Sequence, residues 1–161
     1  MILLALNELN LDYIKGYIHQ GKLYNFGELL KYGIINTTCE SKYELLEPWI
    51  QWATVQTGKA YDEHQIFRLG DMVDRPDLHQ IFEDLEKSGL SVGAISPFNA
   101  DNRLFSSKFF IPDPWTQTNT SGGYLIDKLS RTVSRFVNSN ASGKVGPADV
   151  IWLLLGFIVY V

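Results

Sequence analysis

Short apolar runs and stretches with helical spacing alternate along this chain. The apolar or β-branched runs are four to six residues long and are bounded by polar residues, which is typical of strands buried in a parallel sheet. Between the runs, apolar residues recur every three or four positions, which predicts helices with one buried face. The predicted strands are 1–6, 34–39, 90–95 and 108–111. The predicted helices are 11–18, 26–32, 48–58, 77–87 and 124–138. This order predicts an α/β fold, namely a mostly parallel, doubly wound sheet with flanking helices.

The helix predicted over 48–58 has clear signals at both ends. Pro48 suits a first helical position, where the missing N–H costs nothing, and Gly58 suits a left-handed helix C-terminus. Its N-terminus would present free backbone N–H groups and the positive end of the helix dipole. We therefore expect a phosphate or carboxylate group to bind there.

The residues that follow this helix start carry a resemblance to a known family. They read W-x-x-x-x-T-G-K-x-x-x-x-H-x-I-F, with Trp52, Thr57, Gly58, Lys59, His64, Ile66 and Phe67. This text resembles the segment after the nucleophile in the alkaline phosphatase-like superfamily, in its type I phosphodiesterase/nucleotide pyrophosphatase branch. In that family the helix carries a nucleophilic Ser or Thr at its N-terminus, and the later motif positions the helix. The resemblance covers roughly residues 1–95 and implies a metal-dependent phosphoesterase or phosphodiesterase.

The chain departs from the family where the nucleophile is expected. Counting back from Trp52 places the nucleophile on Pro48, which has no side-chain oxygen, and no Ser or Thr occurs in 42–53. Gln65 also replaces the family's Gly. The candidate catalytic residues at this helix start are Glu47 and Gln51.

Asn7 and Glu8 are the candidate metal ligands. They follow the first predicted strand, where open α/β sheets bind their ligands. In the family this position reads G-L-D-G-L-D, and Asn7 stands in place of the metal-binding Asp. An amide oxygen binds a hard cation without adding negative charge, which Glu8 could supply. Zn, Mn or Mg is the expected cofactor if the protein is active, and none otherwise. The alternative is that Asn7, Asn10 and Asp12 only cap the following helix.

The charge and the cysteine content of the sequence bear on the kinds of partner and on the compartment that we expect. The net charge of −4 over 161 residues, without a basic stripe, argues against nucleic-acid binding. The single cysteine, Cys39, excludes an internal disulfide and is expected to be part-buried in a strand. It suits a reducing compartment, so we expect a cytoplasmic protein, with membrane association left open. His19 and His79 are expected on polar helix surfaces without metal partners.

The C-terminal half contains a long polar loop and an apolar end. The loop over 96–120 is expected to be ordered, with Asp101 and Asp113 as solvated carboxylates. We expect one domain over 1–138, followed over 139–161 by a flexible joint and an apolar segment. The uncharged run 150–161 is shorter than the ~20 residues of a membrane span. Because it is still apolar at its last residue, we expect the chain to be the N-terminal part of a longer protein.

Two function classes follow from these patterns. The first is a metal-dependent phosphoesterase that is incomplete in this chain and acts on a phosphate-containing small molecule or a glycan precursor. The second is a non-catalytic relative that serves as a binding or assembly module, with membrane association through 150–161. A flavodoxin-like binding domain is a third option on fold alone, although no glycine-rich phosphate loop follows the first strand. The pattern does not fix the oligomeric state.

Overall fold

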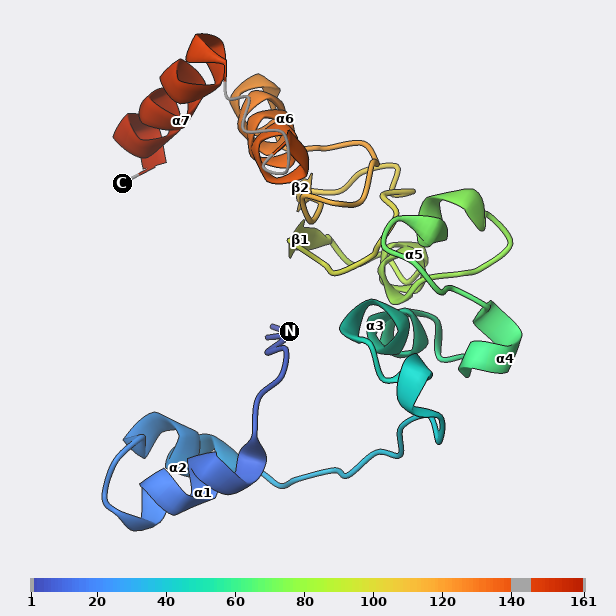
Figure 1. Cartoon of the computed structure of the whole chain (residues 1–161), viewed down its shortest axis with the longest axis vertical. Helices are drawn as coiled ribbons and strands as arrows, with labels where there is room; N and C mark the ends of the chain where they lie inside the picture. Colours follow the sequence, from blue (N-terminus) through green and yellow to red (C-terminus); the bar gives the residue numbers. More distant parts are fainter. Residues whose placement is uncertain (1, 140–145, 161) are drawn as a thin grey trace. The chain divides into compact units, whose positions relative to one another are not determined.

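The computed structural model describes residues 2–139 and 146–160, and the chain divides between Cys39 and Glu40 into two compact units (Figure 1). The first unit contains α1 (Leu11–His19) and α2 (Tyr24–Leu30), which confirms both helices predicted there. Asn10 caps α1, because its Oδ1 accepts the backbone N–H groups of Asp12 at 3.0 Å and of Tyr13 at 3.1 Å.

Two of the predicted strands are not formed. Residues 2–6 and 34–39 belong to no strand, and Ile2 and Ile35 are exposed. A strand exists only through its ladder of hydrogen bonds to a neighbour, and neither stretch pairs with another in the described residues. Cys39 is exposed, so the prediction of a part-buried thiol in a strand was wrong.

The second unit contains most of the elements. In chain order they are η1 (Tyr43–Leu45), α3 (Pro48–Thr57), α4 (Tyr61–His64), η2 (Asp71–Asp74), α5 (Ile81–Lys87), β1 (Gly93–Ile95), β2 (Phe109–Ile111), α6 (Tyr124–Ser139) and α7 (Pro147–Tyr160). The predicted limits of α3 are confirmed, with Pro48 in its first turn and Gly58 in the left-handed region at φ 67°. Thr57 Oγ1 closes the last turn by donating to the carbonyl of Ala53 at 2.7 Å.

The sheet is small. β1 and β2 pair in parallel, with Ala94 opposite Phe110, and the protein is therefore α/β with a two-stranded parallel sheet. The predicted helix–Gly–strand order is present as α5, a left-handed Gly89 and β1. Burial on both faces of 90–95 was wrong, because Ile95 is 71% exposed and only one face of β1 packs inward.

Two apolar clusters form the core of this unit. One contains Ala94, Ala100 and Phe110, with Phe82 packed edge-on against Phe110 at a centroid distance of 5.8 Å. The other joins α3 to the segments that follow it, and its members are Ala53, Ile66, Met72 and Leu78. The first cluster takes Ala100 and Phe110 from the stretch 96–120 that was predicted as a long polar loop.

Side chains hold that loop in place. Gln80 donates from Nε2 to the carbonyl of Asp101 and accepts from its N–H at Oε1, both at 2.9 Å. Arg103 donates to the carbonyls of Met72 and Leu78, each at 2.7 Å, and pairs with the Asp101 carboxylate at 2.7 Å. The loop is ordered as predicted, but Asp101 is an ion-paired carboxylate rather than a solvated one, because Arg103 and Thr118 both bind it.

Helices α6 and α7 pack against each other at the C-terminal end of the unit (Figure 1). Most of the flexible joint predicted over 139–146 lies outside the described residues, since 140–145 are not among them. Within the described parts of the chain, no helix combines the length and apolar character needed to cross a membrane.

Candidate functional site

The first turn of α3 is the candidate site, and three side chains fix its position. The indole Nε1 of Trp49 donates to the carbonyl of Phe67 at 2.9 Å. Gln51 Nε2 donates to the carbonyl of Leu45 at 2.7 Å, and Asn99 Nδ2 donates to the carbonyl of Trp49 at 3.0 Å. The amide of Trp49 stands at the second helical position, where no carbonyl of the helix itself can accept it. The turn is therefore held rigidly while its leading N–H remains directed out of the helix.

Asn99 is the residue on which this arrangement centres. It is fully buried and sits in the left-handed region at φ 52°, which Asn tolerates better than most residues. Its Oδ1 accepts the N–H of Gly70 at 2.8 Å, and its Nδ2 donates to the carbonyls of Trp49 and of Arg68. One side chain thus joins the loop after β1 to α3 and to the segment that follows α4.

Asp113 orients Asn99 in turn. Its carboxylate accepts the N–H groups of Asn99 at 2.8 Å, Trp115 at 2.9 Å and Thr116 at 3.0 Å, and the hydroxyl of Thr116 at 2.7 Å. Because Asp113 is only 1% exposed, the prediction of a solvated carboxylate was wrong. The order Asp-Pro-Trp-Thr is typical of a turn closed by an Asp side chain, and this signal could have revealed the role of Asp113.

His64 secures the other end of α3. Its Nδ1 accepts the N–H of Ile66 at 2.9 Å, so Nε2 carries the proton and donates to Thr54 Oγ1 at 3.1 Å. Burial of the ring lowers the pKa of His64 below its ordinary value of 6.5, and the nearby Glu40 carboxylate opposes this only in part. His64 is therefore a neutral residue that positions α3.

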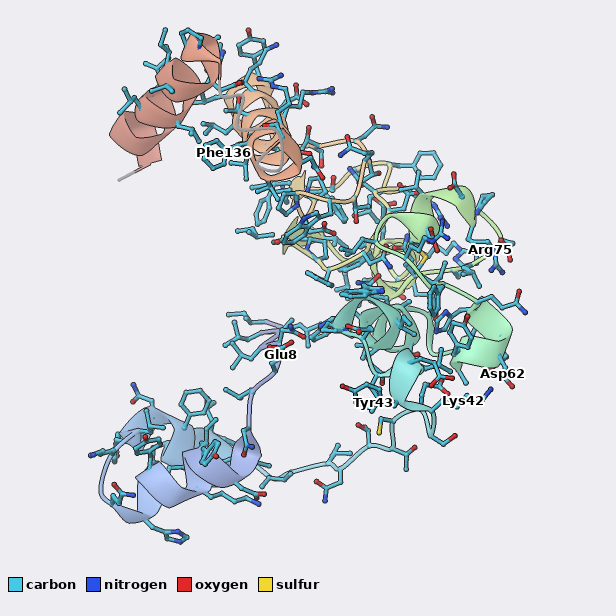
Figure 2. The ribbon with its side chains drawn as sticks, in the orientation of Figure 1. Glu8, Lys42, Tyr43, Asp62, Arg75 and Phe136 are labelled. Carbon is cyan, nitrogen blue, oxygen red and sulfur yellow. The ribbon has the colours of Figure 1, made fainter. Side chains whose placement is uncertain are left out.

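A groove of about 840 Å³ is lined by residues of the stretch before α3 and of the segment 60–67 after it. Its walls include Leu45 and Phe67, whose carbonyls accept the side-chain hydrogen bonds of the turn. The other lining residues are Glu40, Ser41, Lys42, Glu44, Ala60, Tyr61, Asp62 and Gln65. Figure 2 labels Lys42 and Asp62, which come from the stretch before α3 and from α4. The groove is large enough for a small molecule, and its three acidic side chains disfavour a second anionic group there.

The predicted catalytic residues both lie at this helix start, but they have different surroundings. Glu47 is the exposed N-cap residue, with extended backbone and no hydrogen bond from its side chain to the helix. Gln51 is half-buried, and its amide is used to hold the carbonyl of Leu45. Glu47 can therefore reach a ligand, while Gln51 holds the turn in place.

The predicted metal ligands belong to the first unit. Glu8 is exposed and has a left-handed backbone at φ 55°, and it follows Asn7 in a turn before α1. Both offer oxygen atoms, the ligand type that Mg²⁺ or Ca²⁺ prefers, but such ions take about six of them. Across residues 2–139 and 146–160, no three or more His, Cys, Asp or Glu side chains come together to hold a metal ion. Asn7 and Glu8 do not form a metal centre by themselves.

No family model, no curated protein and no solved structure matches this chain. The assignment of function therefore depends on the residues of the site and on the resemblance of the segment 52–67.

Proposed function

We propose that this chain binds a phosphoester at the first turn of α3, as part of a hydrolase of the alkaline phosphatase-like type. The observation that carries the proposal is the rigid, outward-facing first turn of α3, at the place where the resembled family carries its nucleophile. As the resemblance implies, the complete hydrolase would also have the larger doubly wound sheet of that family. Phosphate suits this end of a helix because the leading amide and the helix dipole both favour an anion.

The groove gives the phosphoester an orientation. With the phosphoryl group at Trp49, the organic part of the ester would extend along Leu45 and Phe67 into the groove. The acidic side chains of Glu40, Glu44 and Asp62 favour an uncharged or cationic organic group over a second anion. The favoured ligand is therefore a phosphate ester of a neutral or cationic alcohol.

Glu47 is the residue that can act chemically in this turn. A carboxylate oxygen of Glu47 would attack phosphorus, and the bond from phosphorus to the alcohol oxygen would break. The alcohol would leave with a proton from water, and a second water would hydrolyse the acyl phosphate and restore the carboxylate. Gln51 would hold the turn during these steps. A divalent ion remains part of the hydrolase proposal through the resemblance alone, and we assign it no step.

A second candidate function is a non-catalytic phosphoester-binding module. Pro48 favours it, because this residue occupies the position of the family's hydroxyl nucleophile and has no side-chain oxygen. In that case the first turn of α3 binds the same ligand, and Glu47 performs no chemistry. The two candidates share a binding site and differ only in turnover.

One set of measurements separates them. The amides of Trp49 and Ile50 in ¹⁵N-labelled protein should shift in NMR spectra during titration with phenyl phosphate. Hydrolysis of p-nitrophenyl phosphate and of bis(p-nitrophenyl) phosphate is then followed with and without Mn²⁺, Zn²⁺ or Mg²⁺. Binding with turnover supports the hydrolase, and binding without turnover supports the binding module. If the two amides do not move, both candidates are wrong.

Glu47→Gln provides the decisive variant. It should abolish any turnover and strengthen phosphate binding about fivefold, because it removes a like charge close to the anion. Asp84→Asn is the matched control, since it removes an exposed carboxylate of α5 that does not line the groove. It should leave turnover unchanged, and equal loss in both variants would contradict a nucleophilic Glu47.

A further inference from the structure

Helix α7 carries an apolar surface that its neighbour α6 leaves uncovered. The sequence has no charged residue from 150 to 160. In the described part of this helix, five large apolar side chains are between 37% and 59% exposed, namely Val150, Ile151, Leu153, Leu154 and Leu155. An apolar surface of this kind, on one element and without polar interruption, marks an interaction site.

The opposite side of α7 contacts α6. Asp149 binds Arg135 at 2.5 Å, and Trp152 packs edge-on against Tyr124 at a centroid distance of 6.2 Å. Gly156 lies so close to Leu129 that a Cβ atom there would be 2.4 Å from its Cδ2. With about 100° of helical rotation per residue, these three positions face one side, and the five exposed side chains span about 200° on the other.

The charges of the hairpin formed by α6 and α7 leave a small positive excess. Its two acidic residues are both paired, Asp127 with Arg131 at 2.8 Å and Asp149 with Arg135 at 2.5 Å. Lys128 is the remaining basic residue of the two helices themselves, and its Nζ lies 5.4 Å from the centre of the Tyr124 ring. Three basic residues against two acidic ones give the two helices a net charge of +1.

We propose that the hairpin binds to the surface of a lipid bilayer, with α7 lying in the interface plane. A single partner helix covers a stripe of roughly 100°, whereas acyl chains can cover the whole exposed arc. The Tyr124–Trp152 pair suits the headgroup level, and the excess positive charge favours anionic lipids. This inference is independent of the phosphoester site.

Sedimentation of the full chain with lipid vesicles tests the proposal. The protein should sediment with phosphatidylcholine vesicles, and more strongly when phosphatidylserine is included. The double variant Ile151→Glu/Leu154→Glu should bind both kinds of vesicle roughly tenfold less or weaker still, since it places two charges in the buried arc. Phe105→Glu is the matched control, because Phe105 is 100% exposed but lies outside the hairpin, and it should bind like the unaltered chain. Lys128→Gln should weaken binding only to the phosphatidylserine vesicles.

A measurement on the unaltered chain covers the case in which the double variant fails to fold. On addition of vesicles, hydrogen exchange should slow in α7 and remain unchanged in α5. Absence of sedimentation, or no protection of α7, would overturn the proposal. A dimer that forms without lipid and is lost in the double variant would assign the arc to a second copy instead.

Discussion

The two units of this chain are stabilised in different ways, although both contain helices with ordinary local signals. In the described residues of the first unit, Ile14 is the one buried apolar side chain, and Asn10 caps α1 locally. In the second unit, Asn99 and Asp113 are buried and form hydrogen bonds between segments far apart in sequence. Helix formation is local in both, and the second unit adds these long-range polar contacts, which resist unfolding cooperatively.

The substitution expected to have the largest effect on stability is Asp113→Ala. The change removes the acceptor of three backbone N–H groups and one hydroxyl at a buried site, so we expect a loss of about 3 kcal/mol or more in the free energy of unfolding. Urea unfolding followed by tryptophan fluorescence measures it, because all four tryptophans lie in the second unit. Asp12→Ala, at an exposed position in the first unit, should cost less than about 0.5 kcal/mol, measured by hydrogen exchange of the α1 amides. Equal losses would remove the distinction between the units.

Asn99→Ala should cost nearly as much. It loses three side-chain hydrogen bonds and places Ala in a left-handed backbone conformation, so we expect about 2–3 kcal/mol by the same urea measurement. Asn99→Gly should recover about 1 kcal/mol of this loss, since Gly adopts that backbone without strain. Asn36→Ala, at an exposed site of the first unit, should have no measurable effect. If Gly and Ala are equivalent at position 99, backbone strain plays no part.

The pH dependence of the second unit should reveal His64. Burial lowers the pKa of His64 in the folded state, so the unfolded chain binds more protons as the pH falls below 6.5. The contribution of His64 to stability should therefore be fully present well above pH 6.5 and be lost as the pH falls below 6.5, with a slope of at most about 1.4 kcal/mol per pH unit. Thermal unfolding at pH 7.5 and 5.5 measures the decline, and His64→Gln should flatten it. The pKa values of Asp77, Glu86 and Asp127 are also lowered. These carboxyl groups change protonation below about pH 4.5, so they do not contribute to the decline expected from His64.

The smallest expected effect is in the first unit. Asn10→Ala removes the cap of α1 and should cost about 1 kcal/mol of local helix stability. Faster hydrogen exchange of the α1 amides would show it, with unfolding of the second unit unchanged. Lys15→Ala, exposed on the same helix, is the control and should leave exchange nearly unaltered. A shift in the tryptophan transition would show that the two units unfold together.

Local signals made part of the fold predictable. Pro48 and Gly58 define α3 by backbone chemistry that acts within a few residues, and both limits were confirmed. The prediction of strands over 1–6 and 34–39 was wrong. An apolar run indicates that a segment favours burial, whereas a strand also needs a neighbouring strand in register. Where a neighbour exists, as β2 provides for β1, the predicted strand forms but is shorter.

The site was predictable to the same extent. The position of Glu47 and Gln51 followed from the helix start, but the hydrogen bond from Gln51 to Leu45 depends on how the preceding turn folds back. Asn99 was missed because its partners lie 29, 31 and 50 residues away, at separations that no local pattern encodes. Asp113 was misjudged because loop carboxylates are usually solvated, although its own turn carried a recognisable signal.

The two hydrogen bonds between Gln80 and the backbone of Asp101 make the loop over 96–120 sensitive to deamidation of Gln80. The amide of Gln80 presents the same donor and acceptor that a neighbouring strand would present. Deamidation to Glu exchanges only the NH₂ group for an oxygen, yet it would set a carboxylate against the Asp101 carbonyl inside a fully enclosed site. The replacement closest in shape would then leave Glu86 as the contact of α5 with this loop, whereas a Met at position 80 would remove both contacts without introducing repulsion.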